Sequence, residues 1–392
     1  MRISRTDRSL LAEWWFTVDR HLLAAILLLI GAGFMLSLAA SPAVALHKGL
    51  GEFYFVKRHA VFALAAVPAM IALSAMAPAQ LRRFSLLLFI AALALVAYVL
   101  YSGPEINGAR RWLVIAGQQF QPSELMKPAF VVLSAWLFAQ TAVQPKMPAL
   151  PLAIGLFLLS AAMLVMQPDI GQTLLLTLVW GALFFLSGQP LRRIAIFMLA
   201  GGLAVGAAYA TLPHVRSRVD RFVNPAVGDT YQMDRARASI VEGGLLGRGP
   251  GEGTLKMALP DAHTDYVLAV IAEEYGALAC LALMSLFAFV VFRALAFSWA
   301  ERDPFLRNAA TGLALLLGAQ VLINAGVSAG LLPSKGMTLP FVSYGGSSIV
   351  GVAVGMGMLL AVTRRRPRSP ALMADQDGPG LGFNAADHMG AR

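Results

Sequence analysis

Apolar runs of about twenty residues follow one another along almost the whole chain, and they leave it few ways to fold. The sequence has 392 residues, of which 58% are hydrophobic and 13% are charged, with a mean hydropathy of +0.69. These values lie outside the range of soluble globular domains. In lipid, each backbone polar group must be satisfied within its own helix or barrel. We therefore expect an all-α polytopic membrane protein.

About ten apolar segments are long enough to cross a bilayer as helices. Arginine pairs or triplets lie beside them, at residues 82–83, 192–193 and 364–366. The positive-inside rule then places both termini in the cytoplasm. The basic residues Lys57, Arg58, Arg110 and Arg111 fall on the opposite side, where a ligand would explain them. The expected helices cover residues 22–40, 58–77, 82–101, 122–141, 149–167, 169–187, 191–212, 264–292, 305–329 and 342–362.

One polar stretch, residues 213–263, lies between the seventh and eighth expected helices on the outer side. Its charges nearly balance and it contains the run GGLLGRGPGEG, which favours a folded but mobile flap over a separate domain. We expect a cytoplasmic N-terminal segment (1–20), a transmembrane domain that includes this loop (21–363), and a disordered cytoplasmic tail (364–392). We expect no cleaved signal peptide, because the first apolar segment is long enough to remain as a helix.

Several classes of function lack support in the sequence. The net charge of +10 follows from clusters beside membrane helices, so it does not indicate nucleic acid. A single cysteine, Cys280, allows neither an intramolecular disulfide nor a cysteine-based metal site. Motifs for a phosphate-binding P-loop, a GxSxG elbow, HExxH zinc binding and dinucleotide binding are missing.

Asp265 follows His263 at the start of the eighth expected helix, where the outer loop re-enters the bilayer. An acid in this position meets the headgroup of a lipid substrate while its surroundings stay partly dry. The alternative is that Asp265 caps the helix or lies in its first turn. Glu273 and Glu274 lie two turns deeper, either as a structural pair with Arg or Lys or as part of the function.

Glu124 and Lys127 stand three residues apart, so they share a helical face and can neutralise each other. They are either a structural ion pair or a device that positions a substrate or tunes a nearby acid. Arg111, beside Trp112, is either an interfacial anchor or a cation that contacts a lipid phosphate. Asp169 in QPDIG either caps the sixth helix or lies in a helix break that lines a cavity.

The segment GLLPSKGMTLPFVSYGGSS, residues 330–348, has prolines and glycines that prevent one continuous helix, so we expect it to be re-entrant. Ser347 and Ser348 are expected to allow close helix packing. Lys335 is a lone outer cation suited to an anion. Together, carboxylates and cations at an outer membrane face suit attack of a hydroxyl on an activated, anionic substrate.

Four stretches of the chain together resemble one known family, the SEDS proteins (shape, elongation, division and sporulation) of the FtsW/RodA type. They are NGARRWL with FQPSELMK, then QPDIGQT, then LPDAHTDYVLAVIAEEYG, then AGLLPSKGMTLPFVSYGGSS. They occur in the family's order, and the likeness spans residues 20–362. The runs PDAHTD and KGMTLP are more similar to the division (FtsW) members than to the elongation (RodA) members.

The resemblance implies a ten-helix peptidoglycan glycosyltransferase of the bacterial inner membrane. Such an enzyme polymerises lipid II into β-1,4-linked glycan, releases polyprenyl diphosphate, and serves septal cell-wall synthesis during cell division. Implied partners are lipid II, the growing glycan strand, a class B penicillin-binding transpeptidase and other divisome membrane proteins, but no nucleic acid. No organic cofactor is implied, and a divalent cation, Mg²⁺ or Mn²⁺, stays open.

The resemblance also assigns roles to residues. Asp265 is the expected catalytic residue, acting on our hypothesis as general base for the attacking hydroxyl. Glu124 and Lys127 are the intramembrane pair, and Asp169 is a further cavity carboxylate. The remaining substrate-binding or cavity candidates are Arg58, Arg111, His263, Lys335 and Ser343.

Two other functions compete with this one. A lipid II flippase would also use a broken helix, intramembrane carboxylates and outer cations. It explains an acid at the mouth of a long outer loop less well than hydroxyl activation does. A non-catalytic scaffold that recruits a transpeptidase would leave the intramembrane charges without a use.

Overall fold

The structure is a computed structural model that describes residues 9–47, 49–106, 108–115, 117–211, 216, 220, 231–259, 262–333 and 336–365. The chain divides into two compact units. One comprises Met1–Val18 with Arg364–Arg392, and the other comprises Asp19–Thr363. Lys335, a predicted anion-binding residue, lies outside the described residues.

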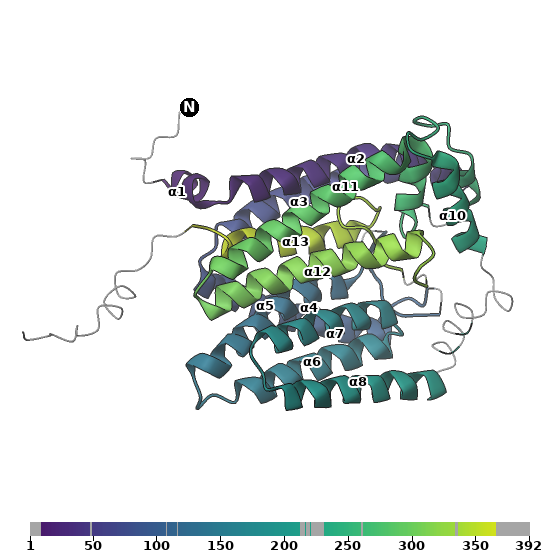
Figure 1. The fold of residues 1–392 in the computed structure, drawn as a ribbon. Helices are drawn as coiled ribbons and strands as arrows, with labels where there is room; N and C mark the ends of the chain where they lie inside the picture. The colour runs from purple at the N-terminus through teal and green to yellow at the C-terminus, as the bar shows by residue number, and fades with distance from the viewer. Residues whose placement is uncertain are drawn as a thin grey trace, which may run out of the picture. The chain divides into compact units, whose positions relative to one another are not determined.

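Apolar helices dominate the described residues (Figure 1). In chain order the helices are α1 Leu10–Thr17, α2 Arg20–His47, α3 Tyr54–Ser74, α4 Pro78–Ser102, α5 Pro122–Val143, α6 Ala149–Met166, α7 Ile170–Leu186, α8 Leu191–Thr211, α10 Tyr231–Gly243, α11 Val267–Ala300, α12 Pro304–Ser328 and α13 Gly346–Val362. A short 3-10 helix, η2 Leu255–Ala258, precedes α11. A hairpin of β1 Leu113–Ile115 and β2 Gln118–Phe120 precedes α5, with Val114 opposite Gln119.

The expected polytopic membrane fold is confirmed. Eight helices in the described part of the chain are long and apolar enough to cross a membrane, and α7 and α13 are shorter apolar helices. Each of the expected segments corresponds to one of these helices, with ends that differ by several residues. The elements that were not predicted are α1, the hairpin, α10 and η2, because none of them has a long apolar run.

The core of the larger unit forms where α5, α12 and α13 meet. Every residue of α13 from Gly351 to Val362 is buried, and α13 packs on α3, α5 and α12. Its glycines permit this close approach. A β-carbon on Gly357 would come within 2.7 Å of the Met70 carbonyl oxygen of α3. Figure 1 shows α13 enclosed by these neighbours.

Helix α8 has the opposite character, because none of its residues is buried. Its ring contacts run from Phe197 to Trp180 of α7 and Phe157 of α6, with centroids 5.1 and 6.0 Å apart. An apolar helix exposed on most of its surface fits a position against lipid. Figure 1 places α8 at the margin of the helices it follows.

Helix α11 is interrupted at Gly276, which has φ 80° and ψ 176°. The glycine-rich loop after α10 fills the interruption and satisfies the backbone groups that the break releases. Four hydrogen bonds of 2.9 to 3.2 Å do this, from the amides of Arg248, Gly249, Ala277 and Leu278 to the carbonyls of Glu273, Glu274, Gly244 and Leu245 respectively. The outer loop is therefore joined to the helix that follows Asp265.

At the other end of the same helix, Arg293 pairs with Asp19, which precedes α2, at 2.9 Å. Burial alone would raise the pKa of the Asp19 carboxyl. Hydrogen bonds from Arg293 and from the backbone amides of Leu22 and His21 outweigh it, so the pKa lies below its ordinary value. In the smaller unit, Arg364 Nε donates to Thr17 Oγ1 of α1 at 2.9 Å.

Replacing Gly276 by alanine is expected to destabilise the protein by about 2 kcal/mol or more, because its backbone lies in a region that only glycine adopts readily. The new β-carbon would also lie 2.3 Å from the Leu245 carbonyl oxygen. The thermal unfolding midpoint in detergent measures the effect. Gly206→Ala in α8 is the control, since nothing lies within 4 Å of that position. Equal midpoints for the two variants would contradict this account of the break.

Candidate active site

The ion pair between Glu124 and Lys127 lies near the outer end of α5. Lys127 Nζ is 2.9 Å from both carboxylate oxygens of Glu124. The two residues are only 4% and 2% exposed. Gln172 of α7 adds a third member, donating from Nε2 to Glu124 Oε1 at 3.0 Å. The prediction that the two charges neutralise each other is confirmed.

A proline and a glycine bring α13 against this pair. Pro128 lies inside α5 four residues after Glu124, so it has no amide to donate to the Glu124 carbonyl. Gly351 of α13 packs directly on that carbonyl, and a β-carbon there would lie 2.6 Å from its oxygen. Only a residue without a side chain allows this contact, so the position of Glu124 depends on the packing of α13.

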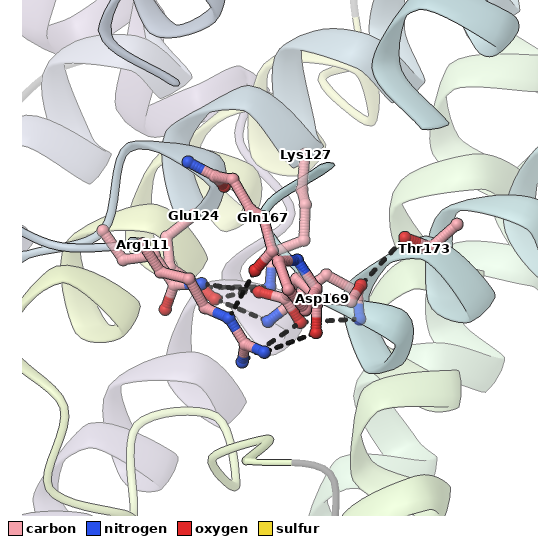
Figure 2. A network of polar contacts seen from close by, with 9 residues as sticks. Arg111, Glu124, Lys127, Gln167, Asp169 and Thr173 are labelled. Carbon is pink, nitrogen blue, oxygen red and sulfur yellow. Dashed lines mark hydrogen bonds and ion pairs between the residues drawn. The ribbon is translucent and has the colours of Figure 1, made fainter. Parts of the chain in front are cut away.

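Asp169 lies at the break between α6 and α7, which the sequence predicted. It caps α7, with Oδ1 3.4 Å from the Gln172 amide, as the simpler of the two interpretations required. Its other oxygen, Oδ2, accepts from Gln121 Nε2 at 3.0 Å. Asp169 is 3% exposed, so both contacts form away from solvent. Figure 2 shows Asp169 and Glu124 within one polar network.

Arg111 connects the chain before β1 to the same break. Its Nε donates to the Gln167 carbonyl at 2.9 Å, and Nη2 donates to the Pro168 carbonyl. Its Nη1 lies 3.8 Å from Asp169 Oδ1. Three contacts of Arg111 are thus made within the protein (Figure 2). This favours a role in fixing the break over the interfacial anchor that the sequence also allowed.

A small cavity lies beneath the ion pair, between α5, α12 and α13. Its volume is about 20 Å³, room for one water molecule. Glu124 and Lys127 line it together with Gln320 of α12. The other lining residues are mostly apolar, so the ion pair lies in a largely dry setting.

Asp265 lies just outside α11 rather than within it. The helix begins at Val267 with Tyr266 as its N-cap, so the interpretation of Asp265 as cap or first-turn residue is wrong. Asp265 is half-buried. Its carbonyl accepts from Asn324 Nδ2 at 3.1 Å and from Ser328 Oγ at 3.4 Å. The backbone that carries the carboxylate is therefore held from α12.

Polar residues spaced by four on α12 extend this support. Asn324, which is fully buried, donates a second hydrogen bond to the Met337 carbonyl at 2.7 Å. Gln320, one turn away, donates to the Thr338 carbonyl at 3.1 Å. Because Gln320 also lines the cavity at Glu124, one face of α12 lies between the ion pair and the Asp265 segment.

The non-helical segment after α12 completes the support of Asp265. Ser343, which is 1% exposed, donates to the Thr264 carbonyl at 2.5 Å and accepts from the Leu339 amide at 2.8 Å. The Tyr344 amide donates to the His263 carbonyl at 2.8 Å. The structure thus places Ser343 in a positioning contact, and its predicted contact with substrate stays a prediction.

An aromatic cluster adjoins this segment. The ring of His263 lies 4.8 Å from Phe55 and 5.6 Å from Tyr344, centroid to centroid. Arg58 lies over Tyr344 at 5.9 Å and donates to the Tyr54 hydroxyl at 2.7 Å. Arg58 is thereby linked to His263 through the ring of Tyr344. Arg111 instead contacts Gln167, Pro168 and Asp169, at the break between α6 and α7.

Glu273 and Glu274 bind residues of the outer loop through hydrogen bonds and an ion pair. Glu273 accepts from the backbone amides of Leu255 and Lys256 at 2.7 and 3.0 Å. Glu274 pairs with the buried side chain of Lys256. The structural interpretation of the two acids is confirmed, with a lysine from the loop as partner of Glu274. Sequence reasoning missed Lys256 because its partner lies eighteen residues away, beyond a change of direction.

The described residues include no group of three or more His, Cys, Asp and Glu side chains placed to hold a metal ion. Magnesium in phosphate-transferring sites is usually held by one or two carboxylates together with the substrate's phosphates. Such an ion would therefore depend mainly on the oxygens of a substrate rather than on side chains of the described residues.

Comparison with known proteins gives consistent matches. The model of the FtsW/RodA/SpoVE family, described as "Cell cycle protein", matches residues 20–368. A relative from Caulobacter vibrioides, named "Probable peptidoglycan glycosyltransferase FtsW", is 42% identical over 388 residues, covering 98% of this chain and 97% of the relative. A relative of the same name from Thiomicrospira cyclica is 36% identical, covering 88% and 91%.

Solved structures agree with these matches. One is described as "Structural coordination of polymerization and crosslinking by a peptidoglycan synthase complex". It matches with a TM-score of 0.73 and 29% identity, covering 88% of this chain and 97% of the other. The rod shape determining protein RodA of Thermus thermophilus matches with a TM-score of 0.64 and 26% identity, covering 91% and 99%.

Lys127→Met is expected to leave the Glu124 carboxylate buried without its cation and to cost roughly 3–5 kcal/mol. The double variant Glu124→Gln/Lys127→Met removes both charges and should be more stable than the single variant. Thermal unfolding in detergent measures both, and Lys57→Met, at an exposed lysine, is the matched control. A single variant as stable as the double one would contradict the pairing.

Proposed function

We propose that this chain, which belongs to the FtsW/RodA/SpoVE family, is a peptidoglycan glycosyltransferase that polymerises lipid II into β-1,4-linked glycan. The observation that carries the proposal is the support of Asp265. Asn324 and Ser328 donate to its carbonyl at 3.1 and 3.4 Å, and its half-buried side chain lies just before α11. Relatives at 42% and 36% identity bear the name of this activity.

In the proposed reaction, the 4-hydroxyl of a terminal glucosamine attacks the anomeric carbon of a sugar that bears polyprenyl diphosphate. Asp265 accepts the hydroxyl proton as the new C–O bond forms. The bond from the anomeric carbon to the diphosphate oxygen breaks, and its electron pair leaves with the diphosphate. The configuration inverts, which gives the β-1,4 linkage.

Charge on the leaving diphosphate needs a cation. We assign this role to Arg58, which reaches the His263 segment through Tyr344. Lys335, outside the described residues, stays a second candidate. A divalent cation, Mg²⁺ or Mn²⁺, would add Lewis-acid stabilisation of the leaving group if one binds there, with the substrate's phosphates as its main ligands, because Asp265 is assigned to the attacking hydroxyl. Arg111 we assign to positioning, because it donates to the carbonyls of Gln167 and Pro168.

The proposal extends to the partners and location. A relative in a peptidoglycan synthase complex supports a class B penicillin-binding transpeptidase as partner. We further propose other divisome membrane proteins as partners and the bacterial inner membrane at the division septum as the location, and relatives named FtsW support both. A multi-pass membrane location rests on the apolar helices themselves.

The rival function, a lipid II flippase, draws its main support from the broken helix at Asp169. That break has a structural explanation, because Asp169 caps α7 and contacts Gln121 and Arg111. The glycosyltransferase therefore accounts for more of the observed geometry.

Asp265→Asn is expected to lower lipid II polymerisation by at least about a hundredfold, since an amide cannot take the hydroxyl proton. Purified protein with a class B partner and labelled lipid II provides the assay, with polymer length read on gels. Glu252→Gln, at an exposed loop carboxylate, serves as control. Wild-type turnover by Asp265→Asn would overturn the assignment. Headgroup translocation without polymer from the wild-type complex would favour the flippase.

Asn324→Asp is expected to lower kcat roughly tenfold or more while KM changes little. The substitution keeps the shape but sets a carboxylate against the carbonyls of Asp265 and Met337, which displaces the general base. Relative to wild type at the same pH, activity should recover partly as the pH falls, because the introduced carboxyl group regains one donor when it is protonated, whereas protonation of Asp265 affects both proteins. Asn308→Asp, at a buried position on the same helix, controls for burial of a carboxylate. Equal losses in both variants would exclude the positioning role.

A further inference from the structure

A second, larger cavity lies between α4 and α5, far along both helices from the active site. Its volume is about 350 Å³, within the range of small-molecule pockets. Its lining includes Arg82 and Arg83 of α4, Gln140 of α5, and Gln144, the C-cap of α5. These residues lie at the start of α4 and the end of α5, whereas Glu124 lies at the start of α5. The positive-inside rule places this end in the cytoplasm.

The charge of the cavity has one sign. Its lining includes two arginines and no acidic residue. In the described part of the chain, neither Arg82 nor Arg83 forms an ion pair with a carboxylate. Asp303 is the acid nearest in sequence to Phe305, whose ring contacts Arg82. Its carboxylate accepts from the Phe305 and Leu306 amides as the cap of α12. The cavity therefore favours an anion.

Arg82 lies against an aromatic ring. Its guanidinium carbon is over the ring of Phe305 at 5.4 Å from the centroid. An arginine in such a contact has edge N–H groups whose geometry matches the oxygens of a phosphate. The side-chain amides of Gln140 and Gln144 add further neutral donors to the lining.

The rest of the lining is apolar, and this distinguishes a lipid from a free anion. Leu86 lines the cavity and is 49% exposed on the outside of α4. Leu133 and Trp136 of α5 line it as well. Tryptophan is enriched at the level of lipid headgroups. A ligand with a phosphate at the arginines and an acyl chain along Leu86 uses both parts of the surface, and inorganic phosphate uses one.

We propose that this cavity binds the phosphate headgroup of an anionic glycerophospholipid of the cytoplasmic leaflet. Basic pockets between helices on the cytoplasmic side suit such headgroups. The ligand would join α4 to α5, the helix that carries Glu124 and Lys127, and so stabilise the support of the active site from the opposite leaflet. This site is separate from the one that the proposed function uses for lipid II.

The test uses the full chain, purified in a neutral detergent and titrated with phosphatidylglycerol while the unfolding midpoint is measured. Phosphatidylglycerol should raise the midpoint more than phosphatidylcholine does. In Arg82→Gln/Arg83→Gln, the phosphatidylglycerol concentration that gives half of the midpoint shift should rise roughly 30-fold, because each lost arginine removes a similar share of the attraction to an anionic lipid. The matched control is Arg192→Gln/Arg193→Gln, an arginine pair at the start of α8 that does not line this cavity.

Gln144→Glu is a second variant, which sets a carboxylate beside the phosphate at an exposed position and should also weaken the response. Equal loss in the control pair would overturn the proposal, because it would indicate general attraction to charged lipid. Equal stabilisation by phosphatidylcholine, or by inorganic phosphate alone, would overturn it too. None of these outcomes depends on glycan synthesis, so failure here and failure of the proposed function are distinguishable.

Discussion

The ion pair of Glu124 and Lys127 is the interaction on which the arrangement of the core depends. Two charges buried at 4% and 2% exposure persist only if each is close to the other and to further polar groups. Lys127 and Gln172 supply those groups at 2.9 and 3.0 Å. Since Gln172 belongs to α7 and Gly351 of α13 packs on the Glu124 carbonyl, one pair fixes the spacing of several helices.

The segment that carries Asp265 depends on the same core indirectly, through helix α12. Helix α12 packs on α5 and α13, and its Gln320 lines the cavity at the ion pair. Its Asn324, one turn further along, holds the carbonyls of Asp265 and Met337. The proposed general base is thus supported through its backbone by a helix of the core. Such support on rigid helices is what precise catalysis requires.

Local patterns in the sequence were enough for the membrane helices and for some of the site. Apolar runs mark the helices, and a spacing of three brings Glu124 to Lys127. Asp169 before a short apolar helix is a cap that sequence rules describe. The family resemblance, not the spacing of residues, singled out Asp265 for catalysis.

Contacts between distant parts of the chain were not predicted, because no local rule describes them. Lys256 pairs with Glu274 only once the loop has folded back on α11. Backbone groups of the same loop form the hydrogen bonds that the break at Gly276 leaves open in α11. Asn324 lies in an apolar helix, and its hydrogen bond to the Met337 carbonyl forms only when a separate segment of the chain packs on that helix. The balanced charges and glycines of the outer loop predict a single flap, but part of the loop forms α10 and η2.

The most direct measurement is glycan synthesis from lipid II by the purified complex carrying the exchanged pair Glu124→Lys/Lys127→Glu, beside each single variant. We expect the single variants to lose activity and the exchanged pair to recover a substantial part of it, because a reversed ion pair still fixes α5 against α7 and α13. An exchanged pair that folds yet is as inactive as the single variants would contradict the account, and would place Glu124 or Lys127 directly on the substrate.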